Sequence, residues 1–182
     1  MSSAQSRRCT ADELLGLRNE KHLELFEGEL FELSSSALAS LIGGQLACGL
    51  HDYSERHGGF VFPTRAGLQC FSDDPECVLK PRASYFAEGK LVHGVPKGWL
   101  RQTPDLVAEV RSRNDQVSLD RKVQVYLEAG IRMVWVACPE SRTVQVYRPS
   151  GESSLLHADD TLIGEDILPG FECRVGELFP PK

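Results

Sequence analysis

Hydrophobic positions recur with helical spacing along two stretches of the chain and alternate with polar positions along several shorter ones. The helical spacing predicts a helix over about 37–56 and a second over 118–129, which Gly130 ends. Two alternating runs around Glu27 and Gly28 predict a hairpin with a glycine turn. Further apolar and alternating runs predict strands at 60–71, 76–86, 103–112, 131–137 and 142–148. Strands and helices mixed in this order predict an α/β fold.

The order of these segments predicts one main domain. Residues 1–20 form a polar lead-in with one short helix, which Thr10 and Glu13 begin as a capping box. No internal repeat, low-complexity tract or linker interrupts residues 21–182, so we expect a single domain there. The runs after residue 153 predict a further strand or two and a closing turn that cover the sheet.

Composition bears on whether this domain lies in a membrane, where it is located and whether its cysteines form disulfides. Of the 182 residues, 41% are hydrophobic, yet no stretch approaches the roughly 18 consecutive apolar residues of a membrane-spanning helix. The N-terminus lacks the apolar core of a secretory signal, so we expect a cytoplasmic protein. The six cysteines show no zinc-like spacing, and free thiols are favoured over a Cys70–Cys77 disulfide.

The net charge limits how the chain binds nucleic acid. A formal charge of −6 argues against a bulk electrostatic contact with phosphates, so DNA binding requires a local group of cations. Six cations lie close together in the sequence and offer such a patch, or else they belong to an ordinary mixed-charge surface. They are Arg101, Arg111, Arg113, Arg121, Lys122 and Arg132.

One strand and the helix after it carry candidate chemistry. On the strand, Asp105, Glu109 and Arg111 point to one face, because side chains alternate along a strand. The helix presents Lys122 one turn before Tyr126. A carboxylate beside a lysine is the minimum for metal-assisted phosphodiester hydrolysis. The alternative is a strand end and a helix start with solvated salt bridges.

The segment 103–147 resembles the core of the Uma-type restriction endonucleases, a family of the PD-(D/E)xK nuclease superfamily. The hairpin at 23–33, the helix from residue 37 and the extended segment up to residue 86 match the family's order, so the resemblance covers about 150 residues. The positions that match the family's core motif are Pro104, Asp105, Leu106, Glu109, Val110, Ser112, Tyr126, Gly130 and Trp135.

The resemblance implies a restriction-endonuclease-like core, a mixed central β-sheet flanked by helices with an N-terminal β-hairpin. It implies that Glu109 is the metal-binding carboxylate and that Lys122, on the helix, is the catalytic lysine. The implied cofactor is Mg²⁺ or Mn²⁺, and the implied partner is DNA. Asp105 is expected to be a strand-start residue that reaches at most the edge of the site.

Three positions depart from the family pattern. Arg82 stands where the family has its metal-binding aspartate, and a permanent cation there repels a divalent ion. Arg111 lies two residues after Glu109, where the superfamily has lysine. Either Arg111 restores the strand cation of an active site, or Arg82 and Arg111 neutralise Glu109 in a buried ion-pair cluster. The helix from Ala37 also lacks the histidine that the family often carries.

Two hairpin glutamates, Glu27 and Glu29, are further candidates: either they lend a second carboxylate to a metal or they are solvated. Two functions from different classes therefore stay open. One is a Mg²⁺-dependent DNA endonuclease with Glu109 and Lys122 in its site. The other is an inactive DNA-binding or protein-interaction module with the same fold. A homodimer formed through the sheet or the tail is a third expectation.

Overall fold

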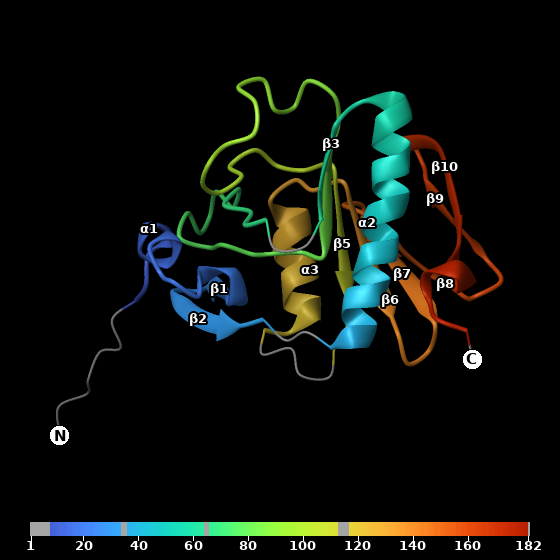
Figure 1. The fold of residues 1–182 in the computed structure, drawn as a ribbon, viewed down its shortest axis with the longest axis horizontal. Helices are drawn as coiled ribbons and strands as arrows, with labels where there is room; N and C mark the ends of the chain where they lie inside the picture. The colour runs from blue at the N-terminus through green and yellow to red at the C-terminus, as the bar shows by residue number, and fades with distance from the viewer. Residues whose placement is uncertain (1–7, 34–35, 64–65, 113–116, 182) are drawn as a thin grey trace.

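A six-stranded mixed sheet forms the centre of the protein (Figure 1). The computed structural model describes residues 8–33, 36–63, 66–112 and 117–181. Strands β5 and β6 are parallel neighbours, and the other neighbouring pairs are antiparallel. This arrangement confirms the predicted α/β fold. In sheet order the strands are β3 (Phe60–Pro63), β4 (Ala83–Phe86), β5 (Leu106–Val110), β6 (Met133–Cys138), β7 (Thr143–Tyr147) and β8 (Ser153–Leu156).

One helix covers each face of this sheet (Figure 1). Helix α2 (Ala37–His57) packs on the face that carries Leu106 and Ala108 of β5. Helix α3 (Leu119–Glu128) connects β5 to β6 and packs on the opposite face, against Val107. Because side chains alternate along β5, Glu109 shares the face of Val107 and is directed toward α3.

The ends of both helices agree with their sequence signals. The Ser36 hydroxyl accepts a hydrogen bond from the Ala39 amide at the start of α2. Gly130 follows α3 with a φ of 85°, a left-handed conformation that favours glycine. The apolar spacing also places Leu38 and Leu41 on the buried face together with Ile42, but both leucines are exposed, because the buried stripe of α2 runs through Ala39 and Ile42.

The C-terminal segment covers the α2 side of the sheet, as predicted. Strands β9 (Thr161–Gly164) and β10 (Leu168–Arg174) form a separate antiparallel hairpin, which a 3₁₀ helix (Val175–Leu178) follows. Phe171 of β10 packs against Trp135, with 5.3 Å between the ring centroids. Trp135 is fully buried in the core that this segment covers.

The N-terminal elements pack beside the sheet. Helix α1 (Ala11–Leu15) begins with the predicted capping box, and its Leu14 is buried against Leu25 and Trp99. A 3₁₀ helix (Glu20–His22) leads into the hairpin of β1 (Leu23–Phe26) and β2 (Glu29–Glu32). Both turn residues, Glu27 and Gly28, have positive φ, as the glycine turn predicts.

The long strands predicted at 60–71 and 76–86 are largely absent. In the described part of 66–81, single β-bridges replace a continuous ladder, among them Leu25–Val78 and Leu68–Leu79. Pro63, Pro75 and Pro81 lack the amide hydrogen that a ladder requires. The six cysteines are free thiols. Among the described residues, no helix is both long and apolar enough to cross a bilayer.

Candidate functional site

Glu109 lies in the buried layer between β5 and α3. Only 5% of the residue is exposed. The Tyr126 hydroxyl donates a hydrogen bond to Glu109 Oε1 over 2.9 Å. Tyr126 stands one turn after Lys122 on α3, and the Lys122 charge acts on Glu109, so this carboxylate and lysine lie in the same buried region.

Lys122 joins α3 to the N-terminal hairpin. Its Nζ donates to Glu24 Oε2 of β1 over 2.5 Å, and both side chains are buried. The other carboxylate oxygen of Glu24 accepts a hydrogen bond from the Lys80 amide over 2.7 Å. Glu24, Arg82, Glu109, Lys122 and Tyr126 are called the Glu109 cluster below.

The surroundings of Glu109 favour its neutral form. Burial raises the pKa of the Glu109 carboxyl from 4.5 to about 7, against the lowering effect of the Lys122 charge. The negative charge of Glu24 raises this pKa further, whereas the Tyr126 hydrogen bond and the Arg82 charge lower it. Burial, followed by the Glu109 charge, also raises the pKa of the Tyr126 hydroxyl. Tyr126 therefore remains a hydrogen-bond donor at neutral pH.

Arg82 lies just before β4 and acts on the cluster through its charge. The next residue, Ala83, pairs with Ala108, so Arg82 lies at the end of the sheet where Glu109 lies. Its side chain passes closely over Gly43 of α2, where an added Cβ would lie 3.3 Å from the Arg82 Cβ. The residue is 9% exposed, and its charge acts on Glu109. A buried cation therefore stands where the resemblance expects a carboxylate.

Glu24 is a site residue that the sequence analysis missed. The hairpin glutamates named as candidates lie near the turn, and both Glu27 and Glu29 are exposed. Glu24 is 2% exposed, and strand alternation places it on the same face as Phe26. The sequence did contain a signal for its burial: Glu24 alternates onto the same strand face as the large apolar residue Phe26, and a buried carboxylate requires a partner.

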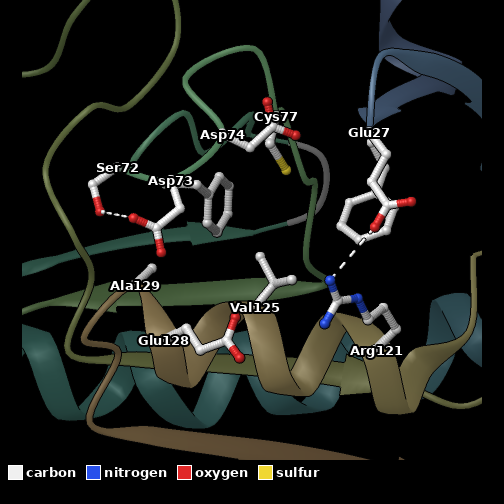
Figure 2. Close-up of a pocket in the computed structure, with 11 residues that line it drawn as sticks. Glu27, Ser72, Asp73, Asp74, Cys77, Arg121, Val125, Glu128 and Ala129 are labelled. Carbon is white, nitrogen blue, oxygen red and sulfur yellow. Dashed lines mark hydrogen bonds and ion pairs between the residues drawn. The ribbon is translucent and has the colours of Figure 1, made fainter.

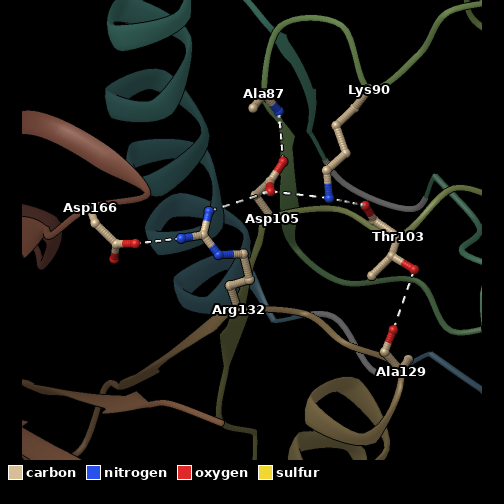
Figure 3. Close-up of polar contacts among 7 residues, drawn as sticks. All are labelled: Ala87, Lys90, Thr103, Asp105, Ala129, Arg132 and Asp166. Atoms are coloured by element: carbon tan, nitrogen blue, oxygen red, sulfur yellow. Dashed lines mark hydrogen bonds and ion pairs between the residues drawn. The ribbon is translucent and has the colours of Figure 1, made fainter.

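Asp105 lies at the other end of β5, about 13 Å from Glu109 at the usual rise of a strand. It is buried, and its Oδ2 accepts a hydrogen bond from the Ala87 amide over 2.9 Å. Figure 3 shows Lys90 and Arg132 directed at its other oxygen, at 3.1 and 3.9 Å, and Arg132 reaching on to Asp166. Asp105 therefore ties together the loop after β4, the start of β6 and the turn before β10.

Arg111 lies outside the Glu109 cluster. Its side chain is 44% exposed and forms an ion pair with Asp120 over 3.0 Å. Arg111 therefore fills neither of its two predicted roles: it is not a cation of the candidate site, and it is not an ion-pair partner of Glu109. The Arg111 amide still donates to the Ala137 carbonyl of β6, and Asp120 lies on α3, so the side chain keeps the face that alternation predicts. At the end of β5, however, the guanidinium reaches the exposed Asp120 and not Glu109.

The cations close together in the sequence are distributed over separate contacts. Arg121 pairs with Glu27, Arg132 with Asp166, and Lys122 with the buried Glu24. The Arg101 guanidinium donates to the Gln69 side chain over 3.2 Å. Arg113 lies outside the described residues. These contacts are typical of a mixed-charge surface rather than a single phosphate-binding patch.

The donor set of the Glu109 cluster does not fit a divalent metal ion. Mg²⁺ takes oxygen ligands in octahedral geometry, usually with one or two ionised carboxylates. Here Glu24 is engaged by Lys122 and the Lys80 amide, and the pKa of Glu109 is raised to about 7. Across the described segments, no group of three or more Asp, Glu, His or Cys side chains is placed to hold a metal.

Comparison with known proteins identifies the family. The family model Uma2, described as "Putative restriction endonuclease", matches residues 11–176. A crystal structure from Anabaena variabilis ATCC 29413, described as a "putative nuclease belonging to DUF820", has the same fold, with a TM-score of 0.78. At 20% identity, the match covers 94% of this chain and 97% of that chain. No curated protein matches the chain. The chain belongs to the Uma2 family of restriction-endonuclease-like proteins.

Proposed function

We propose that this family member is a non-hydrolytic interaction module, which keeps the nuclease fold and binds a protein partner. Restriction-endonuclease-like proteins generally use divalent metal ions and act on DNA. The observation that carries the proposal is the buried cation of Arg82, whose charge acts on Glu109, at the position that the resemblance assigns to the family's metal-binding aspartate.

The charges of the Glu109 cluster support this proposal. The cluster holds two carboxyl groups, Glu24 and Glu109, and two cations, Arg82 and Lys122, so before any ion binds it is neutral when Glu109 is ionised and positive when Glu109 is protonated. A divalent ion would add two positive charges to a site that excludes water. Uncompensated charge in such a site is costly, because the lost hydration is not replaced.

Electrostatics also favours a protein partner over DNA. The net charge is −6, and the described arginines near the site form the contacts given above with acidic or amide side chains. A DNA backbone requires cations that are available to phosphates. We therefore expect duplex DNA to show no saturable binding in fluorescence anisotropy at low salt.

Calorimetry with Mg²⁺ and Mn²⁺ tests the loss of the metal site. We expect no binding heat for the natural protein and measurable binding for Arg82→Asp, because this change removes the cation and supplies a third carboxylate. Arg82→Gln is the matched control, since it removes the charge without supplying a ligand. Clear metal binding by the natural protein would overturn the proposal.

A metal-dependent endonuclease is the second candidate, because Glu109, Lys122 and Glu24 converge in one buried region. It predicts nicking of supercoiled plasmid DNA with Mg²⁺ or Mn²⁺. The activity would be lost in Glu109→Ala and Lys122→Met and retained in Asp105→Asn, since Asp105 lies at the other end of β5. The non-hydrolytic proposal expects no nicking by any of these proteins.

A further inference from the structure

A separate pocket lies on the outer side of α3, next to the Glu109 cluster. Its volume is about 180 Å³. It is bounded by the hairpin turn, the loop 71–77 and the α3 positions 121, 125 and 128, which recur at helical spacing. The lining includes Phe26, Phe71, Cys77, Val125 and Ala129. A cavity of about 150 Å³ holds a benzene-sized molecule, so this pocket has room for one small ligand or for most of one side chain.

The apolar part of the pocket is well enclosed. Phe26, Phe71 and Cys77 are buried, and Phe71 also packs against Tyr126 of the Glu109 cluster, with 6.3 Å between ring centroids. Figure 2 shows the Cys77 sulfur directed toward Val125 on α3. Within the part of the chain that the structure describes, this 1% exposed thiol has no hydrogen-bond partner.

The rim of the pocket is negatively charged. Glu27, Asp73, Asp74 and Glu128 contribute carboxylates, and Arg121 is the one cation among the described lining residues. Arg121 is already paired with Glu27 at 3.5 Å (Figure 2). The side chains of Asp74 and Glu128 have no basic partner among the described residues. Three carboxylates therefore remain around an apolar floor.

The Cys77 thiol lies within the field of these carboxylates. Burial raises the pKa of this thiol well above its usual range, and the charges of Asp74 and Glu24 raise it further, whereas the Lys122 charge lowers it. The thiol is therefore neutral at physiological pH and acts as a soft apolar surface rather than as a nucleophile or metal ligand.

We propose that the pocket binds an alkyl cation, an alkylguanidinium or alkylammonium group, supplied as an arginine or lysine side chain of a protein partner. The apolar stem lies against Val125 and the two phenyl rings, whose faces also attract a cation. The charged head meets Asp73, Asp74 and Glu128. The protein source of the cation rests on the proposed function, whereas its chemistry rests on the pocket alone.

NMR titration tests the chemistry of the ligand. The methyl signals of Val125 and Ala129 are followed while n-butylguanidinium, n-butanol or butyrate is added to the full chain. We expect saturable shifts with n-butylguanidinium, binding about tenfold tighter than n-butanol, and no binding of butyrate. Equal binding of butyrate, or no saturable shift with the cation, would overturn the proposal.

Charge variants at the rim test the role of its carboxylates, because exposed substitutions are expected to leave the fold unchanged. We expect the double change Asp73→Asn and Asp74→Asn to weaken n-butylguanidinium binding about tenfold, and Arg121→Gln to strengthen it, because a like charge is removed. Glu172→Gln, on the exposed surface of β10, is the matched control and is expected to leave binding unchanged. The same affinity in all variants would overturn the role of the rim.

The source of the cation is tested with blocked arginine, N-acetyl-arginine N-methylamide. Binding at least as tight as that of n-butylguanidinium supports a protein side chain. Exclusion of the blocked arginine while the free cation binds would overturn the protein source and assign the pocket to small molecules. These titrations contain no metal or DNA, so their outcome is independent of the calorimetry and nicking experiments.

Discussion

The carboxyl group of Glu109 is buried where its ionised form is disfavoured. Relative to an unfolded chain, the folded protein binds this proton more tightly, because its pKa rises from 4.5 to about 7. The difference corresponds to about 3 kcal/mol. Protonation of Glu109 therefore stabilises the folded protein. Burial of its ionised form lowers the free energy of unfolding: this loss is absent below about pH 4.5, grows as the pH rises, and is complete above about pH 7.

Glu109→Gln should remove this cost, since glutamine resembles the neutral acid and still accepts the Tyr126 hydrogen bond. We expect the variant to be more stable than the natural protein at pH 8, by up to about 3 kcal/mol, and the two to converge near pH 5. Urea unfolding at both pH values measures the difference. Glu172→Gln is the exposed control, and a constant difference between pH 5 and pH 8 would contradict the raised pKa.

Among the elements, the ion pair of Glu24 and Lys122 joins β1 to α3. Lys122→Met leaves the Glu24 carboxylate buried without its cation, and we expect a loss of about 3–5 kcal/mol in urea unfolding. Arg121→Met is the matched control on the same helix. Its ion pair with Glu27 is exposed, so we expect a loss below about 1 kcal/mol.

A second variant separates charge from packing. In the double variant Glu24→Gln and Lys122→Met, both charges are gone and the glutamine still accepts from the Lys80 amide. We expect it to recover more than half of the stability that Lys122→Met loses. No recovery would show that the lysine stem, rather than its charge, stabilises the junction of β1 and α3.

The elements of the fold follow closely from the sequence where local signals act together. Thr10 and Glu13 begin α1, Ser36 begins α2, and Gly130 follows α3 with the expected left-handed conformation. The prediction was wrong where prolines interrupt an apolar run: β3 ends at Pro63. Apolar periodicity reports burial, whereas ladder formation also requires a backbone amide at each position.

The candidate site was only partly predictable, because its members come from elements far apart in the chain. Glu109 and Lys122 are linked by one strand and the next helix, so their meeting follows from local geometry. Glu24 lies 98 residues before Lys122 in the sequence. No local sequence pattern predicts a contact between residues so far apart. The strand pattern gives the face of Arg111 but not its partner, because the nearby Asp120 on α3 competes with Glu109 for its charge.

At the scale of the whole molecule, we expect the described segments to unfold as one unit. The C-terminal hairpin contributes Phe171 to the same core as α2 and Trp135. Phe171→Ala removes a large side chain from that core, so we expect a loss of about 3–5 kcal/mol. Far-ultraviolet circular dichroism and tryptophan fluorescence should shift together.

Leu155→Ala, on the exposed surface of β8, is the matched control for this change, and we expect it to alter stability by less than about 1 kcal/mol. Two separate transitions in Phe171→Ala would contradict a single cooperative unit. They would instead indicate that the β9–β10 hairpin unfolds independently of the central sheet.

The contact between Glu24 and Lys122 also has a consequence for the nascent chain. Glu24 leaves the ribosome 98 residues before its cation, at typical synthesis rates roughly 5–20 s earlier. During that interval the Glu24 carboxylate has no Lys122 to pair with, so its exposure to water is more favourable than its burial. The first strands therefore dock late in folding, after α3 has been synthesised, although they are translated first.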